Sequence, residues 1–75
     1  MSKLPRDVSG RACINALQRA GYVIDRQQGS HITLIRDDPP SRVTVPNHKA
    51  IKVGMLRRII RDADLTVDEF LNLLS

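Results

Sequence analysis

The sequence predicts a small α+β domain of two layers, in which the elements follow the order α-β-β-β-α and a further short helix ends the chain. Apolar residues recur with helical spacing in one segment near the start and in two near the end. Three short β-rich segments lie between them, separated by glycine- and proline-containing turns typical of an antiparallel three-stranded sheet. The chain has 75 residues and no internal repeat or linker, so we expect residues 1–75 to form a single domain.

The first helix is expected to be capped by Ser9 and to run to about Ala20. Its apolar stripe has the spacing i, i+3, i+4 and i+7 and consists of Cys13, Ala16, Leu17 and Ala20. Gly21 stands where a left-handed residue commonly ends a helix. Cys13 is the single cysteine, so it cannot form an internal disulfide, and we expect it to be a small core residue.

Three strands are expected at residues 22–27, 31–36 and 42–45. A loop of about four residues containing Gly29 would join the first two as a hairpin. The sequence DDPPS at residues 37–41 predicts a turn, because its acids and prolines cannot continue a central strand. Pro46 is expected to end the third strand.

Two helices are expected after the strands. The first runs from about Lys52 to Ala63, and its apolar stripe consists of Leu56, Ile59, Ile60 and Ala63. The second lies within residues 66–74, where Thr66 and Glu69 have the spacing of a capping box.

Side chains alternate between the two faces of a strand, which divides the predicted sheet into two sets of residues. Ile32 and Leu34 share one face, and we expect Val43 and Val45 to join them under the helices. The opposite set comprises His31, Thr33, Ile35, Arg42 and Thr44. His31 is therefore expected on the open face of the sheet or at its rim.

The charges are unevenly distributed. The chain has 12 Lys and Arg against 8 Asp and Glu, a net charge of +4, and the segment Lys49–Arg61 contains five basic residues and no acid. Segregated positive charge is typical of a protein that binds a phosphate-bearing partner. A solvated helix face with no such partner is the alternative interpretation.

Several classes of protein do not fit the sequence. The apolar runs are too short to span a bilayer, and the start MSKLPRD has no hydrophobic region of a secretory signal. We therefore expect a soluble cytoplasmic protein. His31 and His48 combined with Asp37 or Asp38 do not show the spacing of a metal site, so we expect no metal and no cofactor.

The order α-β-β-β-α with a basic second helix is shared with double-stranded-RNA-binding domains, which recognise RNA by shape and by backbone contacts. Four motifs extend the likeness: KLPRDVSG at residues 3–10, GSH at 29–31, VTVPNH at 43–48 and KVGMLRRIIRDADLTVDEF at 52–70. In this order and spacing they resemble the HicA family of bacterial toxins over nearly the whole chain. One departure is Met55, where the family commonly has threonine.

The resemblance implies a small ribonuclease that cleaves mRNA and is neutralised by an antitoxin of the HicB family. It also implies that His31, the histidine of the GSH motif, is the catalytic residue. We expect a hetero-oligomer with the antitoxin and a monomer when the toxin is free.

The chemistry is consistent with this implication. Cleavage through the RNA 2′-hydroxyl needs a base, an acid and cations near the phosphate, and histidine suits the first two roles. Gly29 lets RNA approach closely, and Ser30 lies beside His31. His48 is a secondary candidate, either as the acid or as a phosphate ligand, although a turn histidine is more often structural. The expected phosphate contacts are Lys49, Lys52, Arg57 and Arg61.

Two other functions remain open from the sequence. A non-catalytic RNA-binding module would share this topology and use His31 only to contact a ribose. A protein-interaction domain would use its basic face only for a partner. Tyr22 and Phe70 are the only aromatic residues, so base stacking is poorly provided and any RNA binding should depend mainly on the backbone.

Overall fold

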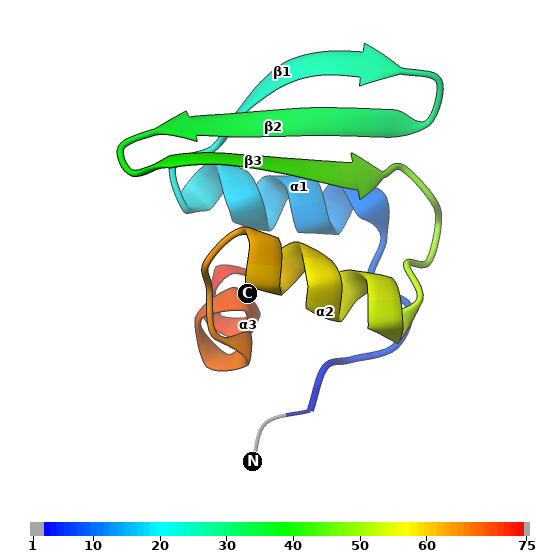
Figure 1. The fold of residues 1–75 in the computed structure, drawn as a ribbon. Helices are drawn as coiled ribbons and strands as arrows, with labels where there is room; N and C mark the ends of the chain where they lie inside the picture. The colour runs from blue at the N-terminus through cyan, green and yellow to red at the C-terminus, as the bar shows by residue number, and fades with distance from the viewer. Residues whose placement is uncertain (1–2, 75) are drawn as a thin grey trace.

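The helices lie on one side of a three-stranded antiparallel sheet (Figure 1). The computed structural model describes residues 3–74, in the order α1 (Gly10–Arg19), β1 (Val23–Gln28), β2 (His31–Asp37), β3 (Pro40–Pro46), α2 (Val53–Asp62) and α3 (Val67–Leu74). The predicted α+β class and element order are confirmed. Met1, Ser2 and Ser75, which belong to the predicted domain, lie outside the described residues.

The helix ends follow the expected local chemistry. The Ser9 hydroxyl accepts a hydrogen bond from the Ala12 amide at 3.0 Å, and Gly21 after α1 has a φ of 98°. At the start of α3 the Thr66 amide donates to the Glu69 carboxylate at 2.8 Å, and the Glu69 amide donates to the Thr66 hydroxyl at 3.1 Å. These contacts satisfy amides that lack partners within a helix, so the predicted cap and capping box are confirmed.

The core lies between the sheet and the helices. The predicted strand alternation is confirmed, because Ile32 pairs with Val45 and Leu34 with Val43, and all four are buried. The same core cluster contains buried residues of the helices, which include Cys13, Leu17, Leu56, Ile59, Ile60 and Phe70. Burial raises the pKa of the Cys13 thiol to about 12, because the apolar core disfavours the charged thiolate.

Both predicted turns were too long. β1 and β2 are joined by only Gly29 and Ser30, because Gly29 adopts a φ of 59° and strand pairing continues to Gln28. The second turn is confined to Asp38 and Pro39, and Pro40 already pairs with Asp37. Proline is tolerated there because β3 is an edge strand, so its missing amide removes no bond from a central ladder.

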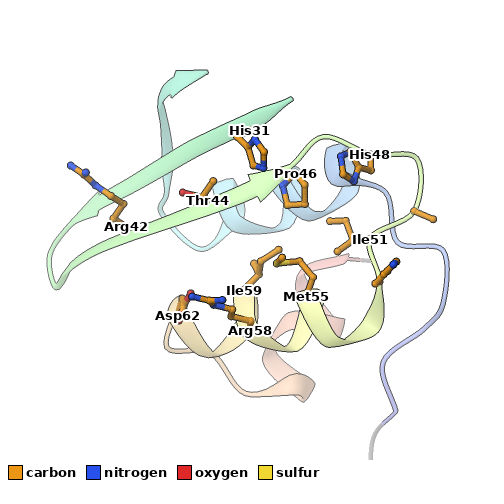
Figure 2. Close-up of a pocket in the computed structure, with 12 residues that line it drawn as sticks. His31, Arg42, Thr44, Pro46, His48, Ile51, Met55, Arg58, Ile59 and Asp62 are labelled. Atoms are coloured by element: carbon orange, nitrogen blue, oxygen red, sulfur yellow. The ribbon is translucent and has the colours of Figure 1, made fainter. Parts of the chain in front are cut away.

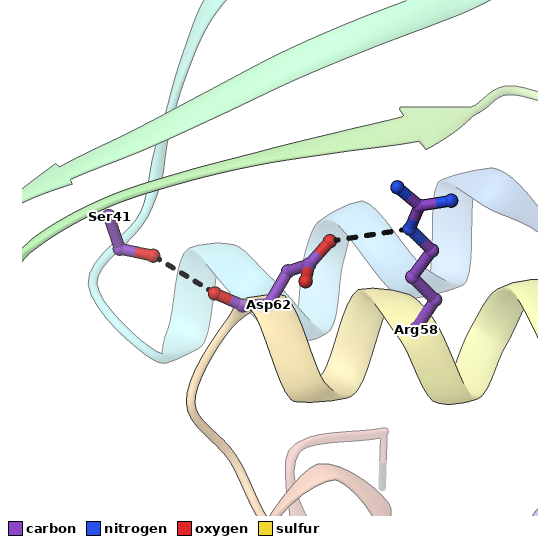
Figure 3. A network of polar contacts seen from close by, with 3 residues as sticks. All are labelled: Ser41, Arg58 and Asp62. Atoms are coloured by element: carbon purple, nitrogen blue, oxygen red, sulfur yellow. Dashed lines mark hydrogen bonds and ion pairs between the residues drawn. The ribbon is translucent and has the colours of Figure 1, made fainter.

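Polar contacts fix the C-terminal end of α2 to the sheet. The Tyr22 hydroxyl lies 2.7 Å from the Ser41 hydroxyl and 3.2 Å from the Ala63 carbonyl oxygen. Ser41 in turn donates to the Asp62 carbonyl oxygen at 3.3 Å (Figure 3). The relative position of α2 and β3 is therefore determined at this end by several bonds.

No helix within residues 3–74 combines the length and apolar character needed to cross a membrane.

Candidate active site

A groove with a volume of about 570 Å³ lies between β3 and α2 and extends to the first residue of β2. Figure 2 shows its side chains projecting from the sheet on one side and from α2 on the other. Its polar and charged lining consists of His31, Arg42, Thr44, His48, Lys52, Arg58 and Asp62. Its apolar lining consists of Pro46, Ala50, Ile51, Met55 and Ile59.

His31 occupies the first position of β2 and is exposed, as the strand alternation predicted. It is paired with Pro46 across the ladder, which places it at the rim where β3 ends. The preceding turn is uncrowded at Gly29, since a Cβ atom built there would lie within 4 Å of no residue other than its chain neighbours. Gly29 and Ser30 are themselves exposed, so a polymeric ligand can approach the imidazole from this side.

His48 lines the same groove from the loop that follows β3. Backbone bonds hold this loop on both sides. The Asn47 amide donates to the Ser30 carbonyl oxygen at 2.6 Å, and the Gly10 amide donates to the His48 carbonyl oxygen at 2.8 Å. A Cβ atom at Gly10 would lie 2.5 Å from the Pro46 carbonyl oxygen, so glycine allows the close approach of α1 to this loop.

Three basic side chains line the groove with the histidines. Lys52, a predicted phosphate contact, is the N-cap residue of α2. Arg42 and Arg58 were not among the predicted contacts. Strand alternation had placed Arg42 on the face of His31, but assigning it a role requires knowing how closely α2 approaches β3. Arg58 follows Lys52 by six residues, and its position in the groove could be predicted only once the orientation of α2 was known.

The predicted contacts Arg57 and Arg61 lie elsewhere. They line a second hollow with Leu65, Thr66 and Val67, at the connection between α2 and α3. Lys49 is exposed in the loop next to His48 but does not line the groove. The structure therefore brings Lys52 together with both histidines and separates Arg57 and Arg61 from them.

The groove contains groups suited to proton transfer and to binding an anion. Imidazole can accept or donate a proton near neutral pH, and lysine and arginine stabilise negative charge on phosphate oxygens. Asp62 is the single acid in the lining and forms a 4.0 Å ion pair with Arg58. Within residues 3–74, no three His, Cys, Asp or Glu side chains are grouped so that they could hold a metal ion.

A comparison with protein-family models identifies residues 10–65 with the HicA toxin of bacterial toxin-antitoxin systems. The chain belongs to the HicA toxin family. The matched region contains both histidines and every residue that lines the groove. A search of curated proteins found no match.

Membership in the HicA family makes this protein the toxin component of a toxin-antitoxin system, which implies an antitoxin as its partner. The family resemblance predicted from the sequence is therefore confirmed, and the matched region runs from the first residue of α1 to the turn before α3.

Proposed function

We propose that this HicA-family toxin is a metal-independent endoribonuclease that cleaves mRNA, with His31 as a catalytic residue. The observation that carries the proposal is the position of His31, which is exposed at the end of a groove that also contains Lys52, Arg42 and Arg58. A cationic groove attracts a polyanion, and an exposed imidazole at its rim can reach the polymer's backbone.

His31 acts on the 2′-hydroxyl next to the scissile bond. The neutral imidazole accepts the hydroxyl proton, and the 2′-oxygen attacks the adjacent phosphorus. Lys52 and Arg58 stabilise the charge that develops on the non-bridging oxygens. The bond between phosphorus and the 5′-oxygen breaks, and the leaving oxygen takes up a proton. One product therefore ends in a 2′,3′-cyclic phosphate and the other begins with a 5′-hydroxyl.

The exposed turn Gly29–Ser30 and the loop residue Lys49 extend the RNA-binding surface beyond the groove. Arg57 and Arg61 contact RNA that leaves the groove and crosses α2, so they contribute to affinity rather than to the chemical step. Backbone contacts of this kind carry little sequence information.

The antitoxin in this proposal is of the HicB type and acts in the cytoplasm, where it forms a hetero-oligomer with a toxin that is monomeric when free. Acidic side chains of the antitoxin lie near Lys52, Arg57 and Arg61, and the bound antitoxin shields His31. Chemical protection of His31 in the complex tests this arrangement, because full exposure of His31 in an inactive complex would exclude direct occlusion.

Digestion of RNA by the purified toxin, followed by analysis of the product ends, tests the proposed reaction. Cyclic phosphate and 5′-hydroxyl ends that form in the presence of a chelator are the expected result. An intact parent protein that binds RNA without cleaving it would overturn the proposal and favour a non-catalytic RNA-binding module.

A further inference from the structure

We propose that His48 is the general acid of the same reaction and protonates the 5′-oxygen as it leaves. This inference rests on the proposed ribonuclease function and adds a second catalytic residue to it. Figure 2 shows the imidazoles of His31 and His48 on either side of Pro46, and both line the groove.

Strand pairing also brings the backbones of the two histidines close together. His31 is paired with Pro46 in the β2–β3 ladder, and His48 follows two residues later, so the two Cα atoms lie at most about 13 Å apart. Two imidazoles that project into one groove from this separation can reach opposite sides of a single phosphodiester.

Backbone hydrogen bonds fix the relative position of His31 and His48. The residue before His31 and the residue before His48 are joined directly, because the Ser30 carbonyl oxygen accepts the Asn47 amide at 2.6 Å. The His48 amide donates to the Pro46 carbonyl oxygen at 2.9 Å, and its own carbonyl oxygen accepts the Gly10 amide at 2.8 Å. The loop is therefore a positioned element, as a pair of acid–base groups requires.

The remaining groove residues are poorer proton donors. Arginine does not release its proton in proteins, and lysine ordinarily titrates near pKa 10.4, whereas the ordinary value for histidine is about 6.5. Asp62 is ion-paired with Arg58 at the end of α2, away from the loop that carries His48. Efficient acid catalysis near neutral pH favours a group whose pKa is close to the working pH.

The two imidazoles transfer protons in opposite directions in this step. Neutral His31 takes the proton of the 2′-hydroxyl while the 2′-oxygen forms its bond to phosphorus with its electron pair. The bond between phosphorus and the 5′-oxygen breaks, its electron pair stays on that oxygen, and protonated His48 supplies the proton. Exchange of protons with water restores both imidazoles.

The test compares two substrates with the same cleavage site, mapped first with the parent toxin. One is ordinary RNA, and the other has sulfur in place of the 5′-bridging oxygen at that site, a leaving group that needs no proton. His48→Ala should slow cleavage of ordinary RNA by about 10²- to 10⁴-fold. On the sulfur substrate, the same variant should retain most of the parental rate. His31→Ala should slow both substrates to a similar degree.

A pH profile gives a second measurement. In the parent, kcat/KM should fall at high pH as the acid loses its proton, and His48→Ala should lack this high-pH decline. His48→Gln, which keeps a polar side chain but cannot act as the acid, should show the same defect and serves if the alanine variant does not fold.

Asn47→Ala is the matched control, because it alters the neighbouring exposed side chain and keeps the backbone amide that binds Ser30. It should cleave both substrates at the parental rate. A folded His48 variant that cleaves ordinary RNA at the parental rate, or that loses the same factor on both substrates, would overturn the assignment. A parent toxin that cleaves neither substrate would instead overturn the proposed function.

Discussion

The two edges of the sheet differ in what covers them. All six residues of β1 are exposed, and Val23 and Ile24 remain 58% and 51% accessible. β3 forms the other edge, and α2 packs beside it to form the groove. The sheet therefore has two edges, and the approach of the basic helix α2 determines which of them borders the groove.

The exposed edge is also irregular. The pairing of β1 with β2 shifts register between Ile24 and Arg26, which leaves Asp25 out of the regular ladder. A bulge with a charged residue interrupts the row of backbone groups that another strand would need for pairing. β1 is therefore a poor template for strand addition, although it carries two exposed apolar side chains.

The largest expected effect is at the start of β2, where His31 pairs with the end of β3 and lines the groove. His31→Ala should lower the rate of RNA cleavage by about 10²- to 10⁴-fold, since it removes a proton-transfer group. The free energy of unfolding should change little, because His31 is exposed and its loss leaves no cavity. Cleavage assays and thermal melting measure the two effects. Gln28→Ala, at the position paired with His31 on β1, is the control and should retain parental activity.

If His31→Ala is folded and cleaves RNA at the parental rate, the assignment of His31 as a catalytic residue is wrong, and His48 is the next candidate in the groove.

The next effect concerns the loop that carries His48. Gly10→Ala should destabilise the fold by about 1–3 kcal/mol, because the added Cβ meets backbone atoms that must move. RNA cleavage should fall as the loop shifts. Gly54→Ala is the matched control: its Cβ would meet no atom within 4 Å, and alanine favours a helix. Urea unfolding of both variants should show a lower free energy of unfolding for Gly10→Ala only.

A smaller effect separates the two basic surfaces of α2. Arg58→Ala should slow cleavage at saturating RNA and flatten the dependence of log affinity on log salt by about 0.7. Arg61→Ala should flatten the slope similarly but leave the saturated rate unchanged, because Arg61 lies in the second hollow. Binding titrations at several salt concentrations measure the slopes. Equal losses of the saturated rate in both variants would contradict the proposal that Arg58 acts in the chemical step and Arg61 only in RNA binding.

The smallest effect is expected at the β1 edge. Ile24→Thr should change the free energy of unfolding by no more than about 0.5 kcal/mol, because the isoleucine side chain is already half exposed and threonine suits a strand. Chemical denaturation checks the stability, and the RNA cleavage rate should equal that of the parent. A loss of several-fold in rate would show that β1 takes part in substrate binding.

The sequence predicted those features that depend on short-range patterns. Helical spacing located the helices to within about a residue or two, and strand alternation placed His31 on the open side. The lengths of the turns could not be obtained in this way, because they depend on the left-handed Gly29 and on pairing at an edge strand. Arg42 and Arg58 were missed because they meet only through the packing of α2 beside β3.

The buried thiol of Cys13 provides a direct measurement of domain opening. Cys13 is the only cysteine in the chain, and its pKa of about 12 keeps it in the unreactive thiol form. Alkylation at neutral pH must therefore wait until the core around Cys13 opens, so the labelling rate reports the free energy of that opening. The native sequence thus contains its own probe, with which the folding of each variant can be followed without an added label.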